Sequence, residues 1–321
     1  MPANRDKPHL WKEDTAHSVD LYNQWFLRFA PDAFRRSRIH ATGEVEKAFA
    51  HTANLTLLTP EILQAHPEVL PILRMATCPP IARDRLIGLS GAPANLVRAM
   101  ELTTRVPPRG RRATIQAGLS ALCTTLAALL DPDFLVWRGR VEPATSTELL
   151  RAATIIADRH CGAMADPIIR NAQEQRQLGG IATWLQGKGY GQLESREVSD
   201  LRSMPPGTYA FRLNVAVRQG TAEGKQVNIP VDAVINARNP SPESLPLLVE
   251  AKSAGDFTNV NKRRKEEATK MAQLRASYGA DTRFVLFLCG YFDSGYLGYE
   301  AAEGIDWVWE HRISDFEELG L

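Results

Sequence analysis

The chain has 321 residues, of which 44% are apolar and 23% charged, the composition of an ordinary globular protein. This length is enough for a substantial core and is typical of two domains. No run of about 18 apolar residues occurs, so no membrane span is predicted, and the first residues lack the apolar segment of a secretory signal. The net charge of +1 does not favour general polyanion binding, although a basic cleft on an otherwise acidic surface can still bind a polyanion.

Cysteine and histidine spacing excludes several kinds of site. The four cysteines are scattered and form no CxxC pair. This is typical of a protein in a reducing cytosol, and it argues against a zinc ribbon or a disulfide framework. The spacing of His51, His66 and His160 does not predict metal ligands either. We therefore expect a cytoplasmic protein whose chemistry rests on other residue types.

The first half of the chain has a helical pattern. In residues 14–29 apolar and aromatic side chains recur at spacings of three and four, which places them on one helical face. Pro31 is expected to end this helix. Three further helices are expected in this half, over residues 42–58, 113–130 and 146–160. We therefore predict a helical N-terminal domain over residues 1–160.

The second half, residues 161–321, mixes helices with strands. A long helix is expected over residues 165–187, with Asp166-Pro167 marking its first turn. The apolar alternation of residues 208–218 predicts a half-buried strand, and the short connection after it predicts an antiparallel neighbour. The remaining elements of this half are expected over residues 226–235, 247–252 and 283–289 as strands and 261–277 as a helix. This order predicts an α/β domain, α+β overall, with a mixed sheet between two helical layers.

Two carboxylates and a lysine lie at the ends of two neighbouring predicted strands. Asp232 is in the strand over residues 226–235, and Glu250 and Lys252 end the strand over residues 247–252. Because alternate strand residues share a face, Glu250 and Lys252 project together, and pairing of the two strands would bring Asp232 beside Glu250. Carboxylates suit Mg²⁺, which lowers the pKa of a bound water. Lys252 would hold or help to deprotonate that water, or stabilise transition-state charge.

The same three residues also fit an ordinary ion pair between Glu250 and Lys252, with an aspartate in a nearby turn. The next helix favours the functional interpretation, because it opens with four consecutive basic residues. A helix N-terminus already attracts anions, so positive side chains at that end oppose the helix dipole unless an anionic partner is present. The alternative is a solvated face on which Glu266 and Glu267 pair with the basic residues.

This arrangement of residues resembles a known group of nucleases. Asp232 followed by Glu250-Ala251-Lys252, in a strand–loop–strand–helix unit, resembles the PD-(D/E)xK nuclease superfamily, except that the proline is one place early, at Pro230. The segments SVDLYNQWFLRFAPDAFRRSR and EAKSAGDFTNVNKRRKEEATKM are similar, more narrowly, to type II restriction endonucleases of the XamI kind. The resemblance implies a restriction-endonuclease-like fold. The helical domain over residues 1–160 would then grip DNA or form a dimer interface.

The resemblance also implies an activity and its partners. These are Mg²⁺-dependent hydrolysis of phosphodiester bonds in double-stranded DNA at a short palindromic site, by a homodimer, with Mn²⁺ able to substitute for Mg²⁺. A companion DNA methyltransferase in the bacterial cytoplasm would protect host DNA. Two alternatives remain: a repair or recombination nuclease of the same superfamily that reads DNA structure, and a DNA-binding protein that does not cleave.

Roles for individual residues follow from the same resemblance. Asp232, Glu250 and the carbonyl of Ala251 would bind the metal, and Lys252 would position the water. Glu174, on the helix over residues 165–187, is a further acidic candidate. The candidate DNA contacts are Ser253, Asn259, Asn261, Lys262, Arg263, Arg264, Lys265, Arg109, Arg111 and Arg112. Either of the two asparagines fits a helix cap equally well, and the last three arginines also fit a solvated loop.

Overall fold

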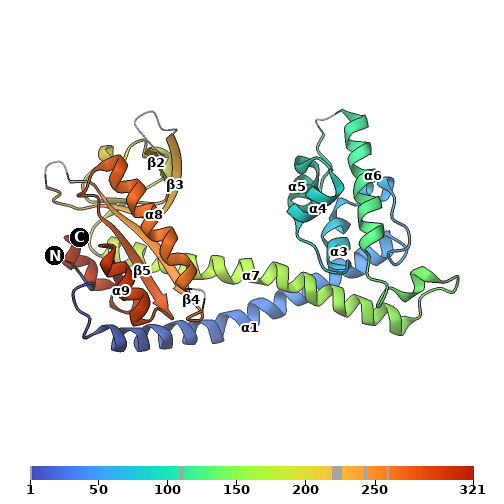
Figure 1. The fold of residues 1–321 in the computed structure, drawn as a ribbon, viewed down its shortest axis with the longest axis horizontal. Coiled ribbons are helices and arrows are strands. Elements are labelled where there is room, and N and C mark those ends of the chain that lie inside the picture. Colours follow the sequence, from blue (N-terminus) through green and yellow to red (C-terminus); the bar gives the residue numbers. More distant parts are fainter. Residues whose placement is uncertain (1, 109–110, 219–225, 242–243, 259) are drawn as a thin grey trace. The chain divides into compact units, whose positions relative to one another are not determined.

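A computed structural model describes residues 2–108, 111–218, 226–241, 244–258 and 260–321, without the side chains of residues 218, 226 and 260–264 (Figure 1). The chain divides into two compact units. A sheet unit comprises Met1–Phe29 and Arg170–Leu321, and a helical unit comprises Ala30–Ile169. The long helices α1 (Trp11–His51) and α7 (Ser146–Gly187) each contribute residues to both units. None of the described helices is long and apolar enough to cross a lipid bilayer.

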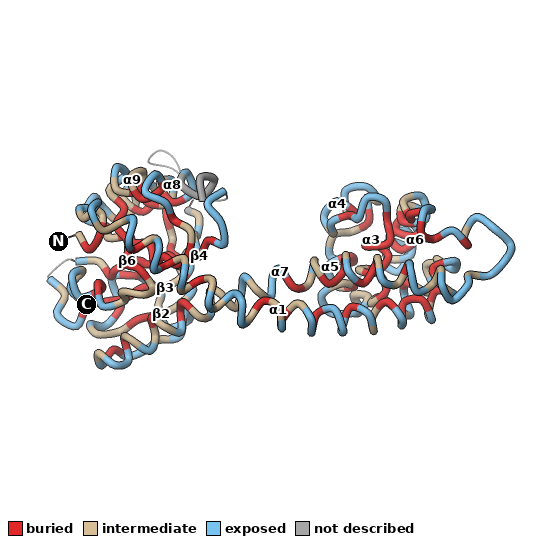
Figure 2. Tube along the Cα trace, turned by 90° about the horizontal axis from the view of Figure 1, so that it is seen from below, coloured by how far each residue is buried: buried red, intermediate tan, exposed pale blue. Residues whose placement is uncertain are grey.

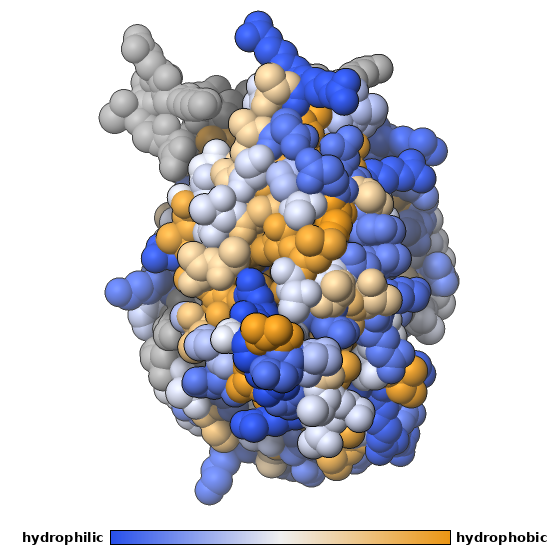
Figure 3. Space-filling model, turned by 90° about the vertical axis from the view of Figure 1, so that its right-hand side faces the viewer, coloured by the Kyte–Doolittle hydropathy of each residue, from blue (hydrophilic) through white to orange (hydrophobic). Residues whose placement is uncertain are grey.

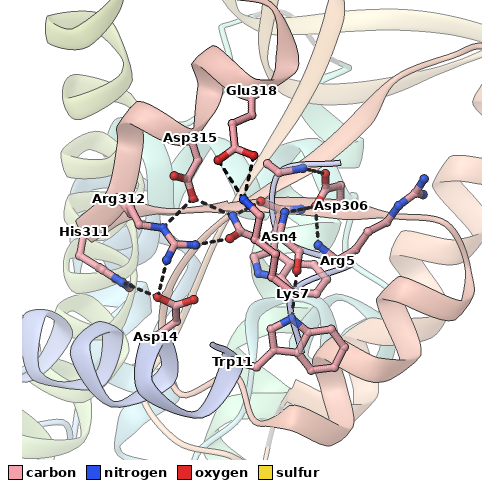
Figure 4. A network of polar contacts seen from close by, with 12 residues as sticks. Asn4, Arg5, Lys7, Trp11, Asp14, Asp306, His311, Arg312, Asp315 and Glu318 are labelled. Atoms are coloured by element: carbon pink, nitrogen blue, oxygen red, sulfur yellow. Dashed lines mark hydrogen bonds and ion pairs between the residues drawn. The ribbon is translucent and has the colours of Figure 1, made fainter. Parts of the chain in front are cut away.

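The first 29 residues belong to the sheet unit, which differs from the predicted division into residues 1–160 and 161–321. A polar network joins the two ends of the chain (Figure 4). The backbone N–H of Asn4 donates to Asp306 over 3.0 Å, and its side chain donates to Asp315 over 2.8 Å. Arg312 donates to Asp14 over 2.9 Å. Contacts between residues some 300 positions apart leave no local pattern in the sequence.

Two prolines that were expected to bound helices lie inside them instead. Pro31 is within α1 and Pro167 is within α7, so the helices predicted separately over residues 146–160 and 165–187 are one. The predictions failed because a proline removes a single backbone N–H donor and bends a helix more readily than it ends a long one. Each proline lies within three residues of the boundary between the two units.

The sheet unit contains six strands in sequence order. The pairs β1–β2, β4–β5 and β5–β6 are parallel, whereas β2–β3 and β3–β4 are antiparallel. The strands are β1 (Gly191–Leu193), β2 (Thr208–Arg218), β3 (Gln226–Asn236), β4 (Leu247–Ala254), β5 (Phe284–Gly290) and β6 (Asp306–Trp309). The mixed sheet predicted from the sequence is therefore confirmed, and the ends of β2, β3, β4 and β5 lie within two residues of the expected positions. The short edge strand β1 was not predicted.

Helices cover both faces of this sheet. On one face α8 (Val260–Tyr278) and α9 (Ser294–Ala302) bury Leu274 and Tyr296 against the strands (Figure 1). On the other, the last turns of α7 and the 3₁₀ segment η5 (Glu310–Leu319) bury Ile181 and Phe316. Every residue of β5 is buried between the two layers, as its continuous apolar run predicted. Its neighbour β6 is buried as well, and so is much of β4 (Figure 2). Two short 3₁₀ turns, η3 (Ser195–Glu197) and η4 (Leu201–Ser203), precede β2.

The helical unit has a core of its own. Leu119, Leu122 and Leu126 recur on one side of α6 (Arg112–Leu129) and are fully buried. The other elements of this unit are α2 (Pro60–Ala65), η1 (Pro67–Val69), α3 (Leu70–Met75), α4 (Arg83–Ser90), α5 (Ala94–Thr103) and η2 (Val136–Gly139). On the face of the protein shown in Figure 3, hydrophilic side chains surround smaller hydrophobic areas. This mixture is ordinary for a soluble surface.

Gly290, at the end of β5, provides a test of the packing. Its φ is +103°, and a Cβ there would lie 2.1 Å from the carbonyl oxygen of Ala254. We expect Gly290→Ala to lower the free energy of unfolding by about 3 kcal/mol or more. The control is Gly179→Ala in α7, where a Cβ meets no atom within 4 Å and should stabilise the protein by about 0.5–1 kcal/mol. Urea denaturation measures both, and equal stability of the two variants would contradict the prediction.

Candidate active site

The register of β3 and β4 brings two acidic side chains together. The hydrogen-bonded ladder between these strands ends at the pair Ala233 and Val249. The next pair in the same register is Asp232 and Glu250, so the strands part where the two carboxylates face each other. The Oδ2 atom of Asp232 accepts the backbone N–H of Ala251 over 2.8 Å. The side chain of Asp232 is thereby tied to β4, beside Glu250.

The carboxyl group of Asp232 has an unusual affinity for protons. Its pKa is raised to about 6, first because the group is largely buried and second because Glu250 is negatively charged nearby. The N–H of Ala251 and the ammonium groups of Lys252 and Lys270 offset part of this effect. Two carboxylates that share one buried position favour a proton or a cation between them. A positive charge beside these two carboxylates is therefore electrostatically favourable.

Lys252 lies between two carboxylates. Its Nζ atom is 3.1 Å from Oε1 of Glu250 and 3.3 Å from Oε1 of Glu267. Burial lowers the pKa of Lys252, but the two carboxylates raise it more, and the net shift is upward. The ammonium therefore stays charged at neutral pH. This favours a role in holding a water molecule or compensating negative charge over a role as a base.

Helix α8 supplies two side chains to the site that the sequence patterns did not assign to it. Glu267 is buried, with 2% of its surface exposed, so the interpretation of Glu267 as part of a solvated face is wrong. Lys270 lies one turn further on, with Nζ 2.6 Å from Oε2 of Glu250 and 2.7 Å from the carbonyl oxygen of Pro230. The spacing of three between Glu267 and Lys270 puts both on the same helix face. Only packing of α8 on the sheet turns that face toward Glu250.

Helix α7 fixes the end of β4 through Gln177. The amide nitrogen of this buried side chain donates to the carbonyl oxygens of Lys252 over 3.3 Å and Phe287 over 3.1 Å. Its amide oxygen accepts the hydroxyl of Ser253 over 3.1 Å. Ser253, a candidate DNA contact, is thus one of the residues that hold β4 in place. Gln177 was not identified from the sequence, because a glutamine on an amphipathic helix carries no distinguishing pattern.

Glu174, the acidic candidate on α7, forms an ion pair with Arg212 at 2.8 Å. Arg212 lies on β2 at the position opposite Asp232 in the β2–β3 register, between the pairs Phe211–Ala233 and Leu213–Val231. Its φ is +53°, an uncommon conformation for a residue with a side chain. In the described part of the chain, the ion pair of Glu174 is with Arg212. Its catalytic assignment remains a proposal.

The candidate DNA contacts fall in three groups. Asn259 and Arg109 lie outside the described residues, as do the side chains of Asn261, Lys262, Arg263 and Arg264. The backbone of residues 260–264 forms the first turn and a half of α8, as expected. Lys265 is exposed on this helix. Arg111 and Arg112 are exposed at the start of α6, in the helical unit.

The structure also brings together two histidines that sequence spacing did not connect. The rings of His51 and His66 stack with centroids 3.6 Å apart and planes 15° from parallel. His66 Nδ1 is 3.3 Å from an oxygen of Glu68. Their ligand atoms are close enough to one another for a metal ion. However, a metal binds in the plane of each imidazole, and two nearly parallel planes at this separation do not share one position. The rings would have to rotate before they could bind a metal.

The donor set at Asp232 and Glu250 fits a divalent cation better. Two carboxylates and the carbonyl of Ala251 are hard oxygen ligands, which Mg²⁺ and Mn²⁺ prefer. The raised pKa of Asp232 means that a proton or another cation is favourable at this position. The same carboxylates also account for the half-buried position of the ammonium groups of Lys252 and Lys270.

The raised pKa of Asp232 predicts a pH-dependent gain in stability from Asp232→Asn. The folded-state pKa of about 6 exceeds the ordinary value of 3.8, so ionising this group destabilises the fold above about pH 6. Without metal at pH 8, the variant should unfold with a free energy about 2 kcal/mol higher than the wild type. The gain should shrink as the pH falls below about 6 and disappear below about pH 3, where the group is protonated in both the folded and the unfolded state. Urea denaturation across this range measures it, and a gain independent of pH would contradict the assigned cause.

The chain is similar in sequence to known restriction endonucleases. The chain matches the XamI restriction endonuclease family over residues 53–309. It is 54% identical over 317 residues, 99% of each chain, to the type II restriction enzyme SalI of Streptomyces albus G. No solved structure matches the chain. Because the family match includes β3, β4 and α8 and covers well over half of the sequence, this chain belongs to the XamI restriction endonuclease family.

Proposed function

We propose that this protein is a type II restriction endonuclease that hydrolyses both strands of double-stranded DNA at a short palindromic site, with Mg²⁺ as its cofactor. The observation that carries the proposal is the meeting of Asp232, Glu250 and Lys252 where β3 and β4 part. Membership of a restriction endonuclease family supports site-specific cleavage. The SalI similarity over the whole chain supports the type II class.

The residues of the site divide the chemistry between them. Asp232, Glu250 and the Ala251 carbonyl would hold Mg²⁺, which when bound lowers the pKa of a water and polarises the phosphate. Lys252 would orient the attacking water and compensate the negative charge that develops on the phosphate oxygens. Its raised pKa keeps it protonated for this task. Glu267 holds the Lys252 ammonium from the other side, at 3.3 Å.

The DNA partners of the protein follow from the same proposal. Lys265 and the basic residues before it on α8, together with Arg111 and Arg112 on α6, would contact phosphates. Two copies of the chain related by a two-fold axis would match a palindromic site. A companion DNA methyltransferase would protect the host DNA. The protein would then act in the bacterial cytoplasm.

Substitutions at the site test the assignment of catalytic residues. We expect Asp232→Ala, Glu250→Ala and Lys252→Ala each to lower the cleavage rate by about 10³-fold or more, because each removes a charge that acts in the transition state. Specific DNA binding should be largely retained. The control is Lys188→Ala, which removes an exposed ammonium paired with Glu317 in the same unit. Single-turnover cleavage and gel-shift binding measure both properties, and wild-type cleavage by Lys252→Ala would show the site to be misassigned.

Digestion of plasmid DNA separates the proposed activity from its alternatives. A restriction enzyme should give discrete bands in Mg²⁺ or Mn²⁺, and its binding should weaken steeply with salt, because phosphate contacts release counterions. A smear, or nicks confined to unusual DNA structures, would favour a repair or recombination nuclease. Binding without cleavage in either metal would favour a protein that only binds DNA. Affinity independent of salt would contradict DNA binding through phosphates.

A further inference from the structure

The two oxygens of Glu250 are each held by a different ammonium group. Lys252, on the same strand, lies 3.1 Å from Oε1. Lys270, on α8, lies 2.6 Å from Oε2. Lys252 is the lysine of the family signature and has an assigned role in the proposed reaction. Lys270 has none, although its contact with the carboxylate is the shorter of the two.

The second contact of each lysine distinguishes them. Lys252 is also held by the carboxylate of Glu267 at 3.3 Å, so a buried negative charge keeps it in place. Lys270 instead donates to the carbonyl oxygen of Pro230 over 2.7 Å. This second partner is neutral and binds a cation less strongly than a carboxylate does. Lys270 is therefore the lysine that can leave Glu250 at the lower cost.

The position of the Lys270 ammonium resembles that of a bound cation. Its two oxygen partners come from β3, at Pro230, and from β4, at Glu250, on either side of the point where these strands part. Asp232 lies two residues after Pro230 on β3 and interacts electrostatically with both Glu250 and Lys270. A positive charge is therefore already present among the oxygens that would receive a divalent ion.

We propose that Lys270 is a built-in competitor of the divalent ion, held at Glu250 in the metal-free protein and displaced from it when the ion binds. This rests on the proposed assignment of Asp232 and Glu250 as metal ligands. An ammonium within about 4 Å of a divalent cation repels it strongly in a partly buried site, and both would draw on the carboxylate of Glu250. The flexible four-carbon stem of lysine allows the ammonium to swing away.

The proposed competition predicts whether a substitution of Lys270 strengthens or weakens metal binding. If Lys270 competes with the ion, removing its charge strengthens metal binding. If Lys270 only orients Glu250 for the metal, removing it weakens binding, because the ligand loses its support. We expect Lys270→Met, which keeps the length of the apolar stem, to lower the dissociation constant for Mn²⁺ by about tenfold. Lys270→Gln should shift it in the same direction.

The measurement uses the full-length protein without DNA, so that no cleavage occurs. Free Mn²⁺ is followed by electron paramagnetic resonance during titration, and thermal melting checks that each variant is folded. Asp232→Asn identifies the signal of this site, because it should lose the corresponding ion. Lys265→Met, on the same helix and with the same loss of charge, is the control for a general electrostatic effect on Mn²⁺ affinity and should change it less than about twofold.

The outcomes separate the two proposals. Unchanged or weaker Mn²⁺ binding in both Lys270 variants, with the Asp232-dependent ion present in the wild type, would overturn the competition and leave the metal assignment intact. Equal tightening by Lys265→Met would also overturn it, since the effect would then be one of overall charge. If the wild type binds no ion that Asp232→Asn removes, the metal assignment fails, and the role of Lys270 falls with it.

Discussion

Asp232 and Glu250 face each other where β3 and β4 part, and the surrounding structure is arranged to tolerate that pair of negative charges. The parting leaves a buried carboxylate, Glu250, beside the half-buried Asp232 where a ladder would otherwise continue, and the pKa of Asp232 rises to about 6 as a result. Lys252 and Lys270 bring positive charge to the same point, from β4 and from α8. The charges at this point thus come from the strand pair β3–β4 and from helix α8.

The supporting residues hold this site on regular elements. Gln177 on α7 binds the carbonyls of Lys252 and Phe287, and it thereby fixes the end of β4 against β5. Glu267 holds the ammonium of Lys252 from α8, which covers the face of the sheet opposite to α7. In the proposed reaction, an ammonium that is held by two layers of the fold keeps its position without substrate, which is what preorganised electrostatic catalysis requires.

Much of the sheet unit could be predicted from local patterns. The strands containing Asp232 and Glu250 were located within two residues, because period-two alternation and continuous apolar runs report burial directly. The helices are predicted less well than the strands, because Pro31 and Pro167 are expected to bound helices although both lie inside longer ones. Glu267 enters only in the alternative of a solvated face, since a charge near the start of a helix gives no sign of which side will be covered.

The sequence by itself determined the mixed α/β class, the strand positions and the acidic pair with its lysine, because each depends on residues close together along the chain. The resemblance to restriction endonucleases also rested on short segments, residues 18–38 and 250–271 in addition to Asp232. Only the tertiary structure decided that residues 1–29 join the sheet unit, that Gln177 supports β4, and that Lys270 reaches Glu250. These contacts join residues from about 20 to some 300 positions apart. Such contacts arise when helices bury their apolar faces against the sheet, a step that no local pattern records.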